Sequence, residues 1–143
     1  MIEAVHDRVE EQPFANAEMT LNQGPVLGRQ FKQRSGGFES YKGIPFAKPP
    51  VGSLRWKPPV PVENWSEPIE ALNVSTVCYQ DARLADSAED YIDFVERGLM
   101  GEDCLTLDIY RPIQASYYPT KYPIMVWIHG GGYVNGASGQ RSK

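Results

Sequence analysis

The sequence predicts a protein of the α/β class, in which a small antiparallel sheet precedes the first strands of a central, mostly parallel sheet. Two observations support this prediction. Short β-rich segments flank turn residues early in the chain, and a nearly all-apolar run, Tyr122 to Ile128, leads directly into glycines. A short apolar run that ends in this way is typical of a strand buried on both faces of an α/β sheet.

Composition and net charge limit the kinds of partner that this protein could bind. The 143 residues are 41% hydrophobic and 11% aromatic, which suffices to bury a core. A net charge of -4 provides no basic surface for nucleic acid. No run approaches the roughly 18 apolar residues that a bilayer-spanning helix needs. We therefore expect neither a nucleic-acid partner nor a membrane span in this segment.

The chain is expected to divide into a leader and a domain. Residues 1–16 are polar, acidic and unpatterned, so we expect a disordered leader there, followed by the domain at 17–143. The charged opening lacks the basic start and apolar stretch of a secretory signal. Either the true start is missing or this form is not secreted, which leaves a cytoplasmic form open.

Two strands around a turn open the predicted domain. Met19–Leu21 and Val26–Phe31 have strand character, and Gly24 with Pro25 supplies the turn.

Six prolines mark the next stretch, residues 38–61. Because proline removes a backbone donor and fixes φ, we expect neither a helix nor a central strand there. The stretch is either a linker or an ordered loop. The apolar residues Phe46, Leu54 and Trp56 favour the loop, because linkers seldom expose aromatic side chains.

A helix and a strand are predicted next. Apolar residues recur at spacings of three and four on one helix face, with Ser87 and Asp90 as a capping box; they are Leu84, Ala88, Tyr91, Ile92, Val95 and Leu99. Strict alternation then places Leu105, Leu107 and Ile109 on one face of a half-buried strand, which ends at Arg111-Pro112.

The residues with the clearest chemistry are the three glycines that follow His129. Adjacent glycines adopt φ values closed to other residues, so their backbone N–H groups can turn toward one point and bind an oxyanion. This motif forms half of the oxyanion hole in lipases and esterases. The competing interpretation is a turn that merely permits close packing. His129 lies on the wrong side of a scissile carbonyl for a base, so we expect it to brace the loop.

Other reactive residues give weaker signals. The two cysteines, Cys78 and Cys104, allow a disulfide, two free thiols or a buried pair. No spacing suits a metal, so we expect neither a metal site nor a cofactor. The triplets at Asn64 and Asn73 are candidate N-glycosylation sites that favour a secretory compartment, with Asn64 the weaker because Trp65 is expected to be buried.

Three motifs together resemble the type-B carboxylesterase and cholinesterase-like family of the α/β-hydrolases. They are the Pro-rich loop Tyr41 to Trp56, the signature strand Glu102 to Pro112, and the His129 loop. Their order agrees with the family from about Met19 to Gly139. The chain is thus expected to be the N-terminal part of an α/β-hydrolase domain, truncated before the nucleophile elbow.

The resemblance also implies roles for individual residues. Gly131 and Gly132 match the glycines whose amides hold the substrate oxyanion, with His129 and Gly130 supporting the loop. Two further pairs match structural contacts, a disulfide and a salt bridge; they are Cys78 with Cys104, and Arg55 with Glu102.

The activity implied is that of a serine carboxylic ester hydrolase that acts on a small-molecule ester through an acyl-enzyme, without a cofactor, in a secretory compartment. The chain matches neither the G-x-S-x-G elbow nor the acid and histidine of the triad. Ser138 lies among glycines but has the wrong spacing. We expect the fragment alone to be inactive and its apolar run to be exposed. A non-catalytic adhesion or binding protein and an inactive short isoform remain alternatives.

Overall fold

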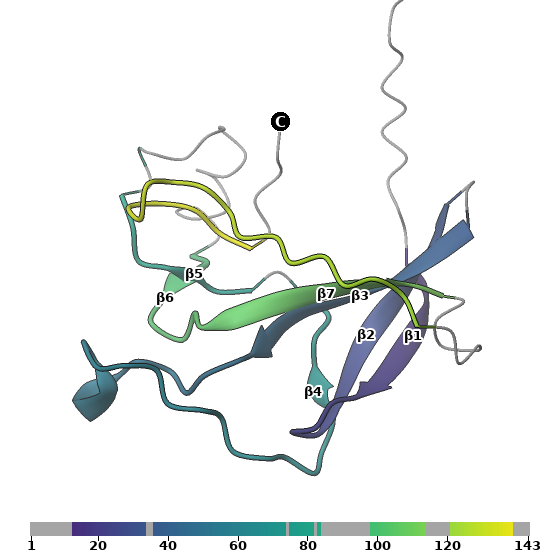
Figure 1. The fold of residues 1–143 in the computed structure, drawn as a ribbon, viewed down its shortest axis with the longest axis horizontal. Helices are drawn as coiled ribbons and strands as arrows, with labels where there is room; N and C mark the ends of the chain where they lie inside the picture. Colours follow the sequence, from purple (N-terminus) through teal and green to yellow (C-terminus); the bar gives the residue numbers. More distant parts are fainter. Residues whose placement is uncertain are drawn as a thin grey trace, which may run out of the picture.

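One twisted sheet of five strands is the main regular element of the described residues (Figure 1). The computed structural model describes residues 13–33, 36–73, 75–81, 83, 98–113 and 121–138. The strands run in the order β1-β2-β3-β7, with antiparallel neighbours, and β4 pairs with β2 in parallel. The bounds of these strands are Pro13–Thr20 (β1), Pro25–Gln33 (β2), Gly36–Pro45 (β3), Ile69–Glu70 (β4) and Thr106–Pro112 (β7).

The predicted pair of strands around Gly24 and Pro25 is present as β1 and β2, with the Leu21 amide bonded to the Gly24 carbonyl at 2.9 Å. Both strands are longer than predicted. β1 begins at Pro13, so residues 13–16, which the sequence assigns to the leader, pair with β2. Residues 1–12 lie outside the described part of the chain.

The middle of the sheet corrects the prediction for residues 38–61. β3 lies between β2 and β7, although no central strand was expected there. The prolines begin only at Pro45, the last residue of β3, and a proline restricts its own position and the one before it. Residues 46–68 do form a loop, with one 3-10 turn at Gly52–Leu54 (η1). Trp56 is 91% exposed, so it does not anchor this loop.

A compact core lies on one side of this sheet. Its fully or nearly buried members come from β1, β2, β3 and the segment after β4, and they are Ala17, Val26, Tyr41, Ile44 and Ala71. Trp65 packs against them and donates its indole N–H to the Pro25 carbonyl at 2.8 Å. Trp65 is partly buried and its N–H is satisfied, which agrees in part with the burial expected from sequence.

β7 confirms the predicted strand at residues 105–110 and ends at Pro112. Its register with β3 is interrupted between Tyr41 and Ile44, where Gly43 has φ 75°. The Gly43 amide bonds to the Asp108 carboxylate at 2.9 Å instead of to a strand carbonyl. Ile109 packs on the core, whereas Leu107 is exposed, so the alternating face is only partly covered.

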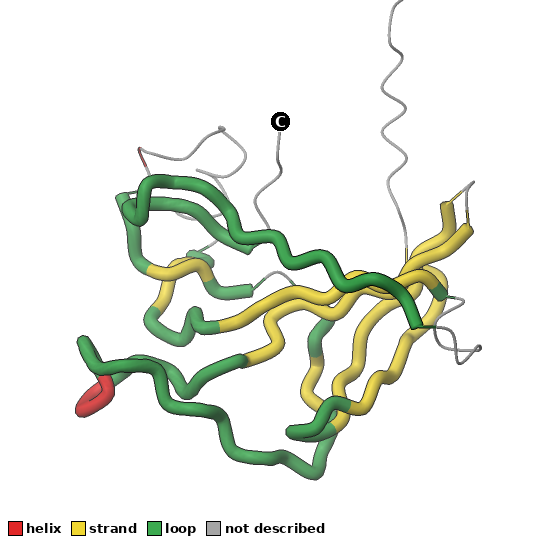
Figure 2. Tube along the Cα trace, viewed as in Figure 1, coloured by secondary structure: helices red, strands yellow, loops and turns green. Residues whose placement is uncertain are grey.

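The apolar run Tyr122 to Ile128 is not a strand, which corrects the prediction of a buried central strand (Figure 2). Its side chains from Ile124 to Ile128 are 74–94% exposed. A central strand needs neighbours that bind its N–H and C=O groups, and no described strand pairs with this run. The exposure predicted for the run is therefore observed. Parallel pairing within the described ranges is limited to β2–β4 and to two short strands, β5 (Val77–Cys78) and β6 (Met100–Gly101).

No α-helix occurs among the residues that the structure describes. The helix predicted from the stripe Leu84 to Leu99 lies outside them except for Leu99 itself. Within the described ranges, no helix has the length and apolar character to cross a membrane.

Candidate oxyanion loop and its supports

The three glycines lie in a tight turn that follows the exposed run. The Gly131 carbonyl accepts hydrogen bonds from the amides of Val134 at 3.0 Å and Asn135 at 3.2 Å. Gly131 has φ 117°, and a Cβ at this position would lie 1.9 Å from the Asn135 carbonyl oxygen. The turn therefore requires glycine at this position, for both its φ and its missing side chain.

The two residues after Gly131 also have left-handed backbone conformations, with φ 59° at Gly132 and 62° at Tyr133. A non-glycine residue pays roughly 1–2 kcal/mol for this conformation. Backbone strain of this kind is found most often at functional sites. Among described residues, the Gly131 and Gly132 amides donate to no protein acceptor.

His129 lies beside the turn. Its Nδ1 atom is 2.7 Å from the Gly130 carbonyl oxygen. A Cβ on Gly136 would lie 2.1 Å from the same nitrogen, so the ring packs directly on the Gly136 backbone. The imidazole thus spans the two ends of the turn.

Gln80 binds the far end of the turn. Its Oε1 accepts from the Gly136 amide at 2.8 Å, and its Nε2 donates to the Gly136 carbonyl at 2.9 Å. Nε2 also lies 3.2 Å from the Cys78 carbonyl. Sequence analysis gave no sign of this contact, which joins residues 56 positions apart.

A second set of hydrogen bonds connects the segment after the glycine turn to the sheet. The Ser138 hydroxyl lies 3.4 Å from that of Ser75, which donates to the Asp108 carboxylate at 3.0 Å. This series of hydrogen bonds connects two serines and an aspartate and includes no histidine. It therefore lacks the base that a hydrolytic triad requires, in agreement with the exclusion of Ser138 as the nucleophile.

Cys78 and Cys104 form a disulfide, with Cα atoms 5.1 Å apart. Cys78 ends β5 (Val77–Cys78), which pairs with β6 (Met100–Gly101). The disulfide therefore fixes the segment that carries Gln80.

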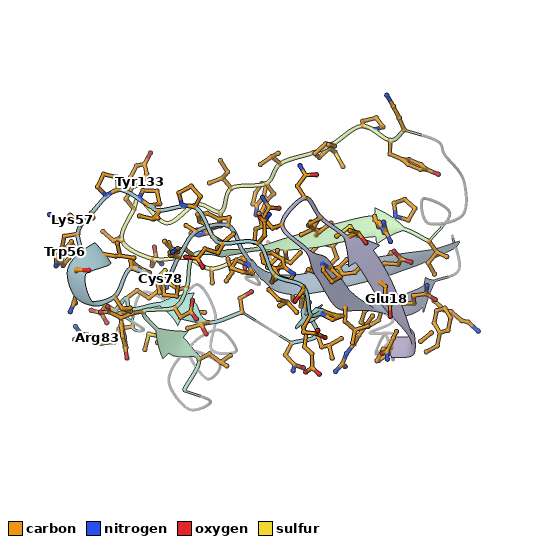
Figure 3. All side chains as sticks on the ribbon, turned by 90° about the horizontal axis from the view of Figure 1, so that it is seen from below. Glu18, Trp56, Lys57, Cys78, Arg83 and Tyr133 are labelled. Carbon is orange, nitrogen blue, oxygen red and sulfur yellow. A yellow bond between two sulfur atoms is a disulfide. The ribbon has the colours of Figure 1, made fainter. Side chains whose placement is uncertain are left out.

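Arg55 and Glu102 lie together as the family resemblance implies, with Nη2 3.1 Å from Oε1. The Arg55 side chain is 57% exposed and Glu102 29%. An ion pair this accessible contributes at most about 1 kcal/mol. The pair joins the loop after β3 to the segment before β7, at the end of the molecule where Figure 3 shows Trp56, Cys78 and Tyr133.

The candidate glycosylation sites differ in their surroundings. Asn64 and Asn73 are both exposed. The hydroxyl of Ser75, third residue of the Asn73 triplet, is buried and bonded to Asp108. Within the described ranges, no cluster of three or more His, Cys, Asp or Glu residues could hold a metal ion.

A buried charge cluster in the sheet escaped the sequence analysis. Glu39 is 1% exposed and forms an ion pair with Arg111 on the neighbouring strand. The Tyr41 hydroxyl donates to Glu39 at 3.0 Å, and the Gln30 amide at 3.1 Å. Burial, then the hydrogen bond to Glu39, raises the pKa of Tyr41 to about 12. Glu39 and Arg111 are direct cross-strand partners, so correct pairing of β3 with β7 would have revealed them.

Known proteins provide an independent test of the family resemblance. A profile described as the carboxylesterase family matches residues 15–143. The medium-chain fatty acyl-CoA hydrolase precursor of Anas platyrhynchos is 38% identical over 133 residues, 90% of this chain and 23% of that protein. Carboxylesterase 1C of Mus musculus is 42% identical over 123 residues, 81% and 22% of the two chains. Cocaine esterase of Homo sapiens is 38% identical over 133 residues, 90% and 24% of the two chains.

These matches confirm the resemblance, and the chain belongs to the carboxylesterase family. It spans less than a quarter of the length of each of these three relatives.

Proposed function

We propose that this chain supplies the oxyanion loop of a serine carboxylic ester hydrolase. The observation that carries the proposal is the state of the Gly131 and Gly132 amides, which have no acceptor among described residues, in a turn within the family match. In the proposed reaction a serine hydroxyl attacks the ester carbonyl carbon, and the carbonyl oxygen becomes negatively charged. Both amides then donate to this oxygen. When the tetrahedral intermediate collapses, the ester C–O bond breaks, the alcohol leaves with the proton taken from the serine, and water later releases the acyl group as a carboxylic acid.

The remaining catalytic groups are proposed to lie beyond this chain. A serine in a G-x-S-x-G elbow, an acid and a histidine would complete the site, and the amide after that serine would add a further donor. His129 and Gly130 would support the loop. We propose that the 143 residues alone do not hydrolyse esters, because an oxyanion hole has no nucleophile of its own.

The proposed substrate is a small-molecule carboxylic ester, handled without a cofactor. Two relatives are named as a cocaine esterase and a fatty acyl-CoA hydrolase precursor, so the relatives' names do not agree on one substrate. The Cys78–Cys104 disulfide supports a secretory compartment, because disulfides persist under oxidising conditions. We keep the proposed division into a leader and a family domain. We place the boundary before Pro13, where β1 starts, instead of after residue 16.

Hydrolysis of p-nitrophenyl butyrate tests the proposal. The 143-residue chain should give the buffer rate, whereas a protein that continues through the nucleophile elbow, the acid and the histidine should hydrolyse the ester. In that longer protein, Gly131→Ala should lower kcat by about 10²–10³, the typical effect of losing an oxyanion donor, because the new Cβ displaces the turn. A longer protein that binds but hydrolyses no ester would favour the non-catalytic alternative.

A further inference from the structure

Gln80 makes a closed pair of hydrogen bonds with one residue of the glycine loop. Its primary amide both accepts from the Gly136 N–H and donates to the Gly136 carbonyl, at 2.8 and 2.9 Å. A single hydrogen bond fixes a distance, but two antiparallel bonds in one plane also fix the orientation of the backbone that they hold. Gly136 is thus restrained in both position and direction.

Gly136 in turn supports the residues that precede it. The His129 ring packs on its backbone so closely that no Cβ could fit, and Nδ1 of that ring contacts the Gly130 carbonyl. The turn between these two ends is closed by the bonds to the Gly131 carbonyl. A change in the orientation of Gly136 therefore passes through His129 to the residues that carry the candidate oxyanion amides.

Gln80 is itself held by a different part of the fold. It lies two residues after Cys78, which is in β5 and in the disulfide to Cys104. Its Nε2 contacts the Cys78 carbonyl, and the neighbouring Val77 amide bonds to the Leu99 carbonyl at 2.8 Å. The support of the loop is therefore a covalently cross-linked segment outside it.

We propose that Gln80 is a positioning residue for the oxyanion hole. It acts through Gly136 and His129 to hold the Gly131 and Gly132 amides in the direction that a tetrahedral intermediate requires, and it touches neither the substrate nor the serine. This inference rests on the proposed function of the glycine loop. A donor displaced by a fraction of an ångström stabilises the intermediate less, while substrate binding is little changed.

Hydrogen exchange of the 143-residue chain tests the contact itself. The Gly136 amide should exchange slowly, and faster in Gln80→Met, which keeps the length of the side chain but removes both hydrogen bonds. Gln23→Met is the matched control, because Gln23 is exposed and lies in the turn between β1 and β2. Equal Gly136 exchange in the unsubstituted chain and in Gln80→Met would overturn the proposal.

Kinetics of a longer protein that carries the nucleophile test the catalytic consequence. Gln80→Met should lower kcat roughly 10- to 100-fold, less than outright loss of an oxyanion donor, with KM within about twofold. Gln80→Glu keeps the acceptor for the Gly136 amide but not the donor, so its kcat should be intermediate. This variant also serves if Gln80→Met does not fold.

The outcomes separate the two proposals. Ester hydrolysis that is equal in Gln80→Met and Gln23→Met, or a change in KM alone, overturns the role of Gln80 and leaves the proposed function standing. A longer unsubstituted protein that hydrolyses no ester overturns the proposed function, and the positioning role falls with it.

Discussion

The N-terminal sheet and the segment 121–138 are held in opposite ways. The strands of the sheet bond to one another through their backbones, and the sheet buries a core with an internal ion pair. The later segment has a more hydrophobic sequence, yet its apolar side chains are exposed and its turn is held by a few polar contacts. Hydrophobicity alone therefore does not make a strand; partners for the backbone do.

The largest change in the free energy of unfolding should come from the buried Glu39–Arg111 ion pair in the sheet. Arg111→Met removes the guanidinium that pairs with the buried Glu39 carboxylate and should lower the free energy of unfolding by about 3–5 kcal/mol. Chemical denaturation followed by tryptophan fluorescence measures this loss. The double variant Glu39→Leu with Arg111→Met is the control, and it should cost clearly less, because no charge is left unpaired. An equal loss in both variants would contradict the buried-charge explanation.

The next effect concerns the disulfide between Cys78, in β5, and Cys104, in the segment before β7. Replacing Cys78 and Cys104 with serine together should cost roughly 3–4 kcal/mol, because the bond closes a loop of 26 residues in sequence separation. Differential unfolding of the oxidised and reduced chain gives the same comparison without substitution. If reduction left the midpoint unchanged, the loop would be constrained by other contacts.

Alkaline pH should act on the sheet through Tyr41. Its pKa is about 12 in the folded protein against about 10 unfolded, so the neutral phenol favours the folded state. The contribution is fully present below pH 10 and is lost as the pH rises to 12, by at most about 2.7 kcal/mol for two pKa units. Denaturation midpoints across this range, with Tyr41→Phe as control, measure the effect. Equal pH dependence in the two proteins would contradict it.

The smallest effect should come from the exposed run. Val126→Thr should change the free energy of unfolding by less than about 0.5 kcal/mol, because Val126 is 81% exposed. Val26→Thr, at a fully buried position of β2, is the matched control and should cost several times more, because it places a hydroxyl in the core. Comparable losses at the two positions would mean that the run is packed in solution.

Strands were predictable where a local pattern, either a turn or an alternation of apolar residues, marks them. The turn at Gly24 and Pro25 and the alternation in residues 105–110 gave β1, β2 and β7 nearly correctly. β3 was missed because the prolines after residue 44 were taken to affect the residues before them. The run at 122–128 was misassigned because its pattern specifies a buried environment, which the described residues do not provide.

The candidate site was predictable only where residue type restricts the chemistry. Three adjacent glycines predict backbone φ values that other residues seldom adopt. Two cysteines allow only a disulfide, two free thiols or a buried pair. Gln80 gave no signal, because a glutamine near a cysteine is unremarkable until the fold brings Gly136 to it. The Glu39–Arg111 pair depended on a strand register that no local pattern specifies.

The central claim is that the Gly131 and Gly132 amides bind the oxyanion. The most direct measurement is the NMR shift of these two amide protons when a trifluoromethyl ketone forms a tetrahedral adduct with the serine of the longer protein. Both protons should move downfield on adduct formation, as expected for new hydrogen bonds to an anion. Formation of the adduct with both signals unmoved would contradict the account.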